Sequence, residues 1–386
     1  MNFWGYKRPD GKVGIRNHIL ILPTCACSSE TCRMTASQVQ GAVSIINQNG
    51  CAQVEGDLAI TKAVLAGLAA NPNVYGTVLI GLGCESAQPA DMEALIRTKT
   101  NKPLKTLVIQ EEGGTVVTIR RAVEYAMQMT LEASRLQREE FPLSELIVGT
   151  NCGGSDPTSG IGANLVVGNL SDRLVDAGST SILCETTEFI GAEQVLAEQA
   201  ATPEVARQIY AIVKRYEDHL ARVGEGLRNG NPSPGNKAGG ISTLEEKSLG
   251  CIHKGGHRPI VEVFDYAQPP TKKGLVIMDT PGYDIASVTG VAAGGAQVMV
   301  FTTGRGTPTG NPIMPVLKIT GNKETFSKMR DNIDFDASPI VSGERLVADM
   351  GAELLTDVIA VANGQMVRSE ALGFSDIAIS RLCNYV

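Results

Sequence analysis

Short apolar runs rich in β-branched residues alternate along this chain with longer stretches of helical periodicity. This alternation predicts βαβ units built around largely parallel sheet. In the first part of the chain, strands are predicted at residues 18–24, 42–46, 76–83 and 106–112, and helices at 57–70 and 115–140. The polar segment 137–145 is predicted to be a linker, because the strand pattern starts again directly after it.

A second set of units follows this linker. It comprises strands at 145–150, 273–280 and 296–303, a unit over 172–185, and a long helix over 192–227. Residues 229–240 are rich in Pro, Gly and Asn and are expected to form a loop or linker. The pattern therefore predicts an α/β protein with two Rossmann-like open-sheet domains, at residues 1–140 and 141–386.

Polar, glycine-rich clusters follow each predicted strand. They are PTCACSSE, NQNGCAQ, GLGCESAQP, QEEGGT, TNCGGSD, CETTE, DTPG and TTGRGTPTG. Ligands of open α/β sheets bind at the carboxyl ends of the strands, so these loops are expected to form one shared site. Glycine turns and helix N-termini favour a carboxylate, phosphate or sulfonate ligand. A plain tight turn is the alternative for any single loop.

Composition narrows the classes of partner. The 386 residues are 43% apolar, which is enough for a core in each domain, and the net charge is −7. With no long Lys/Arg run, we expect neither nucleic acid nor membrane as a partner. No Walker A motif occurs, and no GxGxxG follows the first strand. A signal peptide is not evident, so the protein is expected in the cytoplasm, acting on a small anionic molecule.

Nine cysteines in a protein expected in the cytoplasm indicate thiols or metal ligands rather than disulfides. Four of them follow strands beside glycine or an acid and are predicted metal ligands: Cys27, Cys51, Cys84 and Cys152. Close packing of small thiols is the alternative, and it is preferred for Cys184 and Cys383. A trio of Cys251, His253 and His257 is a weaker metal candidate.

Charged residues gather on the same loops. The carboxylates are Glu85, Glu111, Glu112, Asp156, Glu185, Glu188 and Asp279. Together they could hold a divalent metal against a substrate carboxylate, although solvation or helix capping would explain any one of them. Lys247 and Lys254 flank Cys251, and each could pair with a substrate anion or act as a base if desolvated.

Several motifs are similar to those of a known family. GYKRPDGKVGIRNH, GLGCE, TNCGGSDPTSGIGANLVVG, CETTEFIGAE, GNPSPGNKAGG, EEKSLGC, MDTPGYD and FTTGRGTPTGNP together resemble the altronate and galactarate dehydratase family, to which the large subunit of sulfolactate sulfo-lyase also belongs. The resemblance covers nearly the whole chain. It implies a lyase that removes a β-substituent from a 2-hydroxy acid, with Fe²⁺ as the expected cofactor and Mn²⁺, Mg²⁺ or an iron–sulfur cluster as alternatives.

On this basis we assign roles to the loop residues. The predicted catalytic residues are Asp156, Lys247, Glu85 and Glu188, and the predicted substrate-binding residues are Arg16, Asn17, Gly153, Gly154, Ser155, Ser159, Asn164, Thr303 and Arg305. A metal-bound carboxylate substrate has an acidified α-proton, because the cation and nearby N–H donors share the enolate charge. The TNCGGSD loop is expected to hold metal and oxyanion.

The chain differs from fused members of that family in two respects. Those members carry a small β-rich domain ahead of the GYxRxDG motif, so a separate small β-rich subunit, and hence a hetero-oligomer, is expected here. The stretch IINQNGCAQ lacks the histidine that sugar-acid dehydratases carry upstream, which favours a short sulfonated substrate. The first hypothesis is therefore (2R)-3-sulfolactate cleavage to pyruvate and sulfite; sugar-acid dehydration and a noncatalytic binding subunit are the alternatives.

Overall fold

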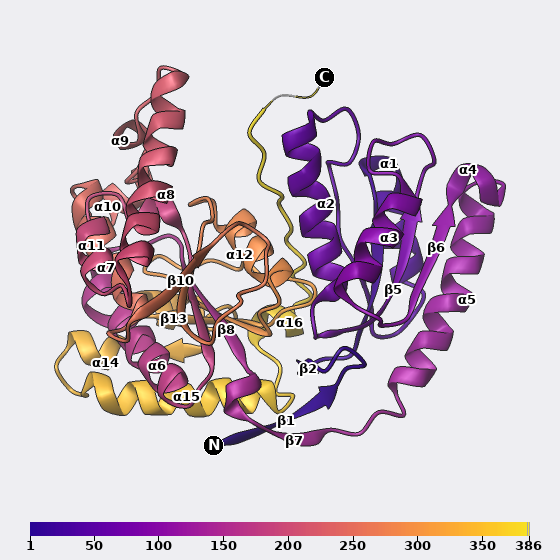
Figure 1. Cartoon of the computed structure of the whole chain (residues 1–386). Helices are drawn as coiled ribbons and strands as arrows, with labels where there is room; N and C mark the ends of the chain where they lie inside the picture. Colours follow the sequence, from indigo (N-terminus) through magenta and orange to yellow (C-terminus); the bar gives the residue numbers. More distant parts are fainter. Residues whose placement is uncertain (384, 386) are drawn as a thin grey trace.

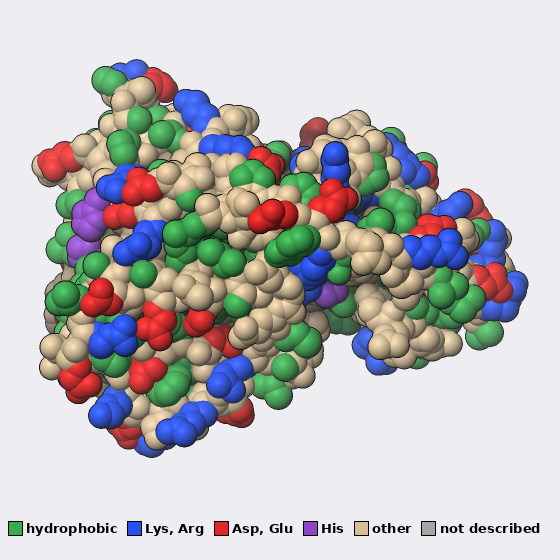
Figure 2. Space-filling view, turned by 90° about the horizontal axis from the view of Figure 1, so that it is seen from below, with side chains coloured by type: hydrophobic (Ala, Val, Ile, Leu, Met, Phe, Trp, Pro, Cys, Tyr) green, Lys and Arg blue, Asp and Glu red, His purple; other side chains and the backbone are tan. Residues whose placement is uncertain are grey.

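Two parallel sheets with helices packed on them form the body of the protein, which confirms the α/β class (Figure 1). The structure is a computed structural model and describes residues 1–383 and 385. Among these residues, no helix is both long and apolar enough to cross a membrane. Seen from below, the surface is hollowed between a larger and a smaller lobe, and acidic and basic side chains are interspersed over both (Figure 2).

The smaller lobe is built on a four-stranded sheet of order β4-β3-β5-β6, in which all neighbours are parallel. Its elements are β3 (His18–Pro23), α1 (Ala26–Ala36), β4 (Ala42–Ser44), α2 (Glu55–Ala70), β5 (Val74–Gly81), α3 (Pro89–Lys99), β6 (Leu104–Val108), α4 (Ile109–Glu112) and α5 (Thr115–Ala133). Successive strand residues point to opposite faces. Ile19 and Ile21 accordingly pack with α1 and α5, whereas Leu20 and Leu22 pack with α2 and α3.

The larger lobe contains a seven-stranded parallel sheet of order β10-β11-β9-β8-β12-β13-β14. Its strands are β8 (Ile147–Cys152), β9 (Thr180–Leu183), β10 (Ile260–Phe264), β11 (Gly274–Met278), β12 (Val298–Thr302), β13 (Val316–Thr320) and β14 (Phe335–Asp336). The helices are α6 (Asn164–Asp176), α7 (Glu193–Glu198), α8 (Pro203–Arg222), α9 (Leu227–Gly230), α10 (Pro234–Ala238), α11 (Leu244–Ile252), α12 (Asp284–Ala293), α13 (Lys323–Lys328), α14 (Ser338–Val341), α15 (Val347–Ala362) and α16 (Arg368–Ala371). Short helical turns cover 143–145, 159–163, 186–188 and 253–255.

A small antiparallel sheet of order β2-β1-β7 lies between the two lobes, at the bottom of the view in Figure 1. It consists of β1 (Asn2–Lys7), β2 (Val13–Gly14) and β7 (Glu139–Pro142). The prediction of a linker over 137–145 is therefore wrong for part of that segment. Phe141 pairs with Phe3 in the ladder, and burial of Phe3 holds the segment in a strand.

The two larger sheets are joined by one hydrophobic cluster, in which α2 packs against α12. A Cβ at Gly67 would lie 2.4 Å from the carbonyl oxygen of Ala293, so the close approach of these helices requires glycine. Asn71 also donates to the carbonyl oxygens of Ala292 (2.7 Å) and Ala296 (2.9 Å). The lobes therefore share a core, and the division into domains at residue 140 stays a prediction.

Several predicted element boundaries are wrong for local reasons. The strand expected to reach residue 112 ends at Val108, and the following turn of helix ends at Gly113, whose φ is 91°. The helix predicted over 115–140 ends at Ala133. The one predicted over 192–227 is broken, because Thr202 caps a new helix that begins at Pro203. The sequence reading also missed β13 and α15.

Candidate active site

Four loops meet at the carboxyl end of the seven-stranded sheet. They follow β8, β9, β11 and β12, and helix α11 lies over the first two. Side chains of these loops contact one another directly: Glu185 accepts a hydrogen bond from the Cys152 amide (2.8 Å), and the Glu185 amide donates to Thr280 (2.7 Å). The neighbouring strands β8, β9 and β11 thus bring together residues far apart in the sequence.

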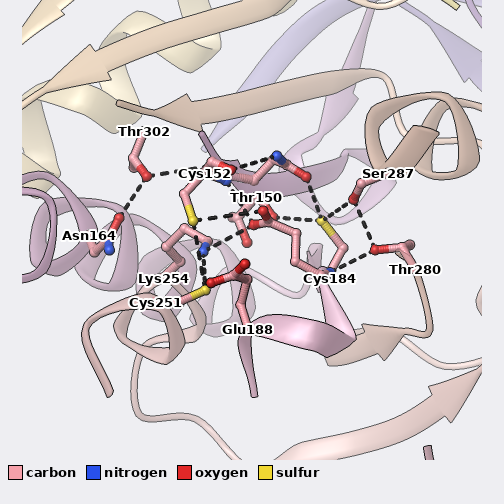
Figure 3. A network of polar contacts seen from close by, with 12 residues as sticks. Thr150, Cys152, Asn164, Cys184, Glu188, Cys251, Lys254, Thr280, Ser287 and Thr302 are labelled. Carbon is pink, nitrogen blue, oxygen red and sulfur yellow. Dashed lines mark hydrogen bonds and ion pairs between the residues drawn. The ribbon is translucent and has the colours of Figure 1, made fainter. Parts of the chain in front are cut away.

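The centre of this region is a buried cluster of two thiols, a carboxylate and an ammonium group (Figure 3). The Sγ atoms of Cys152 and Cys251 are 3.8 Å apart, and Glu185 Oε1 lies 3.7 Å from Cys152 Sγ. Lys254 Nζ lies 2.7 Å from Cys251 Sγ and 3.2 Å from Glu185 Oε2. We call these four residues the thiol cluster. Both charged side chains are at most 1% exposed.

Burial and mutual contact shift the pKa values of three groups in the thiol cluster. Its hydrogen bond to Cys251, together with burial, raises the pKa of Cys152. Burial, together with the nearby thiol of Cys152, raises the pKa of Glu185. Burial alone would lower the pKa of Lys254, but the two thiols and Glu185 raise it instead. Lys254 is therefore the fixed positive charge of the cluster.

Glu185 also has an unusual backbone. Its φ of 74° and ψ of 65° lie in the left-handed region, which side chains other than glycine and asparagine rarely adopt. Such a conformation costs on the order of 1–3 kcal/mol and persists where its surroundings impose it. Here the hydrogen bonds to Cys152 and Thr280 hold the residue, which directs the carboxylate into the thiol cluster.

A second buried ion pair lies beside the cluster. Lys247 Nζ donates to Glu188 Oε1 (2.9 Å) and to Asn231 Oδ1 (2.8 Å). Burial by itself would lower the pKa of Lys247. Glu188 and the Cys152 thiol raise this pKa by more than burial lowers it, so the net shift is upward. Lys247 is thus a cation rather than a base in this arrangement. The second oxygen of Glu188, Oε2, is buried without a hydrogen-bond partner.

Asp284 approaches the same region from the start of α12. A Cβ built on Gly153 would lie 2.1 Å from Asp284 Oδ2, so the carboxylate packs directly on the glycine of the TNCGGSD loop. Burial raises the pKa of Asp284 to about 7; Lys247 opposes this shift and Glu188 adds to it. A carboxyl group with such a pKa can both accept and donate a proton near neutral pH.

A cavity of about 260 Å³ opens between the loop after β8 and helix α11. Its wall includes Cys152 and Cys251 of the thiol cluster, the Lys247 side chain, and Ser155 and Asp156. Apolar surface from Ile161, Ile241 and Leu249 completes it. The cavity therefore joins one ammonium group, two thiols, the carboxylates of Asp156 and Glu246, and glycine backbone, and its size suits a small polar ligand.

Comparison with known proteins identifies the family of the chain. Residues 5–134 match the second domain of D-galactarate dehydratase/altronate hydrolase, and residues 143–384 match the C-terminal domain of D-galactarate/altronate dehydratase. The chain belongs to the galactarate/altronate dehydratase family. The resemblance found in the sequence is thus confirmed.

Relatives in this family are dehydratases and a sulfo-lyase subunit. The chain is 37% identical to the (2R)-sulfolactate sulfo-lyase subunit beta of Chromohalobacter salexigens, over 98% of this chain and 97% of that protein. It is 34% identical to Bacillus subtilis altronate dehydratase, over 98% of this chain and 77% of that protein, and 34% identical to Escherichia coli galactarate dehydratase, over 94% and 73% respectively. The protein is accordingly a lyase.

Three hydrogen-bond donors hold the carboxylate of Asp156. Oδ1 accepts from Thr158 Oγ1 (2.6 Å) and from the amide of Ser159 (3.2 Å), and Oδ2 accepts from Asn322 Nδ2 (2.8 Å). Asp156 thereby caps the helical segment that follows Pro157, and it also lies on the cavity wall. Asp156, which was predicted to be catalytic, thus has a structural role as a helix cap.

The other residues predicted on these loops lie close together. Gly154 accepts a hydrogen bond from the Arg305 amide (2.9 Å), and the Thr303 hydroxyl accepts from Gly306. Asn164 joins three elements through hydrogen bonds to Thr302 and Gly250. The Arg305 side chain is exposed beside Gly154. Ser155 and Ser159 lie on the cavity wall, where Ser159 accepts from the Asp156 amide.

Residues 229–240, expected as a loop or linker, cover this site. Asn236 donates to the carbonyl oxygen of Ser155 (2.8 Å), and a Cβ at Gly239 would lie 3.1 Å from Asp156. A Ser–Pro–Gly–Asn turn starts the short helix α10, with Ser233 and Asn236 forming a capping box. The segment therefore shapes the wall of the site.

The remaining predicted residues lie on the smaller lobe. Glu85 accepts from the amides of Leu82 (2.9 Å) and Gly83 (2.6 Å) and from Thr24, and these hydrogen bonds outweigh burial and lower its pKa. Glu85 thus closes the turn after β5. Cys27 is exposed in the first turn of α1, and Cys51 and Cys84 are exposed on the loops after β4 and β5. In the described part of the chain, only Cys152, Glu185 and Cys251 form a group of three ligand atoms within 4.8 Å.

Arg16 and Asn17 precede β3, so they lie at the amino end of its sheet, away from the loops. Arg16 makes a bidentate ion pair with Glu370 (2.8 and 2.9 Å), and Asn17 accepts from Arg8 (2.8 Å). Arg16 therefore fastens the C-terminal region to the start of the sheet, whereas Asn17 joins β3 to the N-terminal segment.

The histidine trio does not form. His253 and His257 are exposed, and His257 pairs with Asp172 (3.1 Å) instead of approaching Cys251. Cys184 is buried, as expected, and donates to the carbonyl oxygen of Thr150 (3.0 Å). The sequence analysis considered Cys251 only as part of the histidine trio and Lys254 only as a partner for a substrate anion or a base, and it gave Asp284 no role.

Proposed function

We propose that this chain is the large subunit of a divalent-metal-dependent lyase that eliminates a β-substituent from a small anionic 2-hydroxy acid. The proposed reaction converts (2R)-3-sulfolactate to pyruvate and sulfite. The observation that carries the proposal is the cavity whose wall combines the Lys247 ammonium with the glycine-rich loop after β8. Family membership supplies the reaction class.

The side chains around the cavity suit the groups of such a substrate. Lys247 keeps its charge because Glu188 stabilises it, so it can pair with a carboxylate or sulfonate. Arg305, exposed beside Gly154, is a second cation for the other anionic group. Lys247 on helix α11 and Arg305 on the loop after β12 would then pair with the two ends of a substrate that carries a negative charge at each end.

The chemistry requires a proton acceptor at the α-carbon. A carboxylate removes the C2 proton, and the C3–S bond breaks with its electron pair leaving on sulfite. The resulting enol takes up a proton at C3 and becomes pyruvate. Asp284 and Glu188 are the candidate acceptors, since Asp284 has a pKa of about 7 and Glu188 has an unpartnered buried oxygen. A bound divalent metal, Fe²⁺ in our proposal with Mn²⁺ or Mg²⁺ as alternatives, would supply charge stabilisation for the enolate.

The choice of leaving group rests on the comparisons. Identity to the sulfo-lyase subunit beta is 37%, against 33–34% to the three dehydratases. The name of that relative also supports a hetero-oligomer, and we propose a small β-rich subunit as the partner. We further propose that the two large sheets represent two Rossmann-like domains, since each is fully parallel with its own helices. Sugar-acid dehydration is the second candidate, because three relatives carry dehydratase names.

One assay separates the candidates. The chain is mixed with a sulfo-lyase small subunit and Fe²⁺ under anaerobic conditions, and sulfite and pyruvate are measured from (2R)-3-sulfolactate. Parallel reactions contain altronate or galactarate, with formation of a 2-keto acid as readout. Sulfite release supports the proposal, whereas 2-keto acid formation from a sugar acid alone selects dehydration. No turnover of any substrate by the reconstituted pair contradicts both and favours a binding subunit.

A further inference from the structure

The thiol cluster has a composition that packing does not require. Two thiols and a carboxylate converge within 4.8 Å, and all three residues are buried. They come from three separate places in the fold: the end of β8, the loop after β9 and the end of α11. Thiols form weak hydrogen bonds, so two of them placed against a carboxylate and an ammonium group add little stability as neutral groups. As thiolates, however, they are strong ligands for soft or borderline divalent metals.

We propose that Cys152, Glu185 and Cys251 bind a thiophilic divalent cation, Fe²⁺ or Zn²⁺, and that Lys254 neutralises the excess negative charge of this ligand set. The inference rests on the proposed function only for the role of the cation in turnover, because binding can be measured without substrate. It assigns the metal to the larger lobe, whereas the sequence had pointed to thiols on both lobes.

The charges of the cluster support this assignment. With both thiols ionised, the three ligands and Lys254 carry a net charge of minus two, which a divalent cation cancels. With both thiols protonated, Glu185 and Lys254 cancel each other at 3.2 Å. A buried site therefore has no net charge in either state, which avoids the large cost of an unpaired buried charge. Without Lys254, the metal-bound state would keep one uncompensated negative charge.

Access and orientation are consistent with a ligand site. Cys152 and Cys251 both line the cavity that opens to the surface, so a cation and a substrate can approach the same two residues. The left-handed backbone of Glu185 directs its carboxylate into the cluster rather than along the strand. The unpartnered Oε2 of Glu188 is buried close by, as Figure 3 shows for the side chain beside Cys251.

The test uses the full-length chain, treated with a chelator and reduced, and Co²⁺ as the spectroscopic probe. We expect one Co²⁺ to bind per chain and to give thiolate-to-cobalt charge-transfer absorption in the near ultraviolet. In Cys152→Ser and Cys251→Ser the intensity should fall by about half, since each variant removes one of two thiolate ligands. Lys254→Met should keep the band but weaken affinity about 10- to 100-fold, the usual effect of losing an outer-sphere partner.

Cys184→Ser provides the matched control. Cys184 is also buried and directly precedes Glu185 on the loop after β9, but its thiol hydrogen-bonds to Thr150 and Asn151 and lies outside the group of three ligands. This variant should bind Co²⁺ like the wild type. Circular dichroism of every variant checks that it is folded, and Glu185→Gln supplies a ligand variant that keeps both thiols.

Two results would overturn the proposal: no charge-transfer band in the wild type, or a band that survives in the Cys152→Ser/Cys251→Ser double variant. The second result would place the metal on the exposed thiols of the smaller lobe. The outcome is independent of the assay for sulfite. Binding at the cluster without turnover would contradict the proposed function alone, and turnover without binding at the cluster would contradict this inference alone.

Discussion

Replacing Asp156 by asparagine tests whether this loop residue acts through structure or through chemistry. Asn322 Nδ2 donates to Asp156 Oδ2, while Asn322 Oδ1 is already occupied by the amides of Glu324 (3.0 Å) and Thr325 (3.2 Å). Asn322 therefore cannot turn its amide around without uncapping α13. In Asp156→Asn, one oxygen still serves Thr158 and Ser159, but the new NH₂ group faces the NH₂ group of Asn322.

The expected loss follows from these contacts. A hydrogen bond to a charged group contributes about 1.5–3 kcal/mol, so Asp156→Asn should lower the free energy of unfolding by about 2 kcal/mol. The compensating double variant Asp156→Asn/Asn322→Asp should recover most of this. In that variant, a carboxylate at position 322 can cap α13 with one oxygen and accept with the other from the new amide group at position 156. Urea unfolding followed by circular dichroism measures both.

Activity separates the two roles of Asp156. If it only caps the helix, the double variant should recover turnover together with stability. If its charge also serves the reaction, stability should return while turnover stays about 10²- to 10³-fold low. An unchanged unfolding midpoint in Asp156→Asn would refute the capping argument itself.

Two further substitutions test the buried charges. Lys247→Met leaves Glu188 buried without its ammonium partner and should cost about 3–5 kcal/mol, with a smaller loss in Lys247→Met/Glu188→Leu; a loss in the double variant equal to the sum of the two single losses would show that the pair is not coupled. Burial raises the folded-state pKa of Asp284 from 3.8 to about 7, so its contribution to stability is fully present below pH 4 and is lost as pH rises towards 7. In Asp284→Asn the unfolding free energy should lack this decline; a wild-type profile that matches the variant from pH 4 to 8 contradicts the assignment.

The central strands of the fold were predictable because a strand that is buried on both faces appears in the sequence as a nearly continuous apolar run. His18–Pro23 is almost wholly apolar and forms a central strand, as predicted from the run HILIL. In contrast, buried and exposed side chains alternate in β1, and β7 contains two glutamates. These segments form strands because they pair with each other. The break before Pro203 was readable from the sequence, since proline at a first helical position and threonine at the cap are both start signals.

The composition of the site was less accessible to sequence reasoning. Alternation of strands and helices shows that polar loops follow strands, but it does not show which strands share a sheet, so eight loops expected at one site belong to two sheets. Arg16 and Asn17 were misplaced for a simpler reason: a residue that precedes a strand lies at the opposite edge from one that follows it. Cys251 lies 99 residues from Cys152, and only the packing of α11 on the turn at 159–163 brings the thiols together.

Two glycines in the loops of the site allow carboxylates to pack directly against the backbone. A Cβ at Gly153 would lie 2.1 Å from Asp284 Oδ2, and one at Gly304 would lie 2.3 Å from Asp156 Oδ1. Neither glycine has a positive φ, so close approach rather than backbone conformation requires them. Each glycine thus makes room for a carboxylate that must come near the loop. The anionic substrate that we propose would therefore depend on the cations Lys247 and Arg305 for its attraction, since the glycine loops bring carboxylates to the same place.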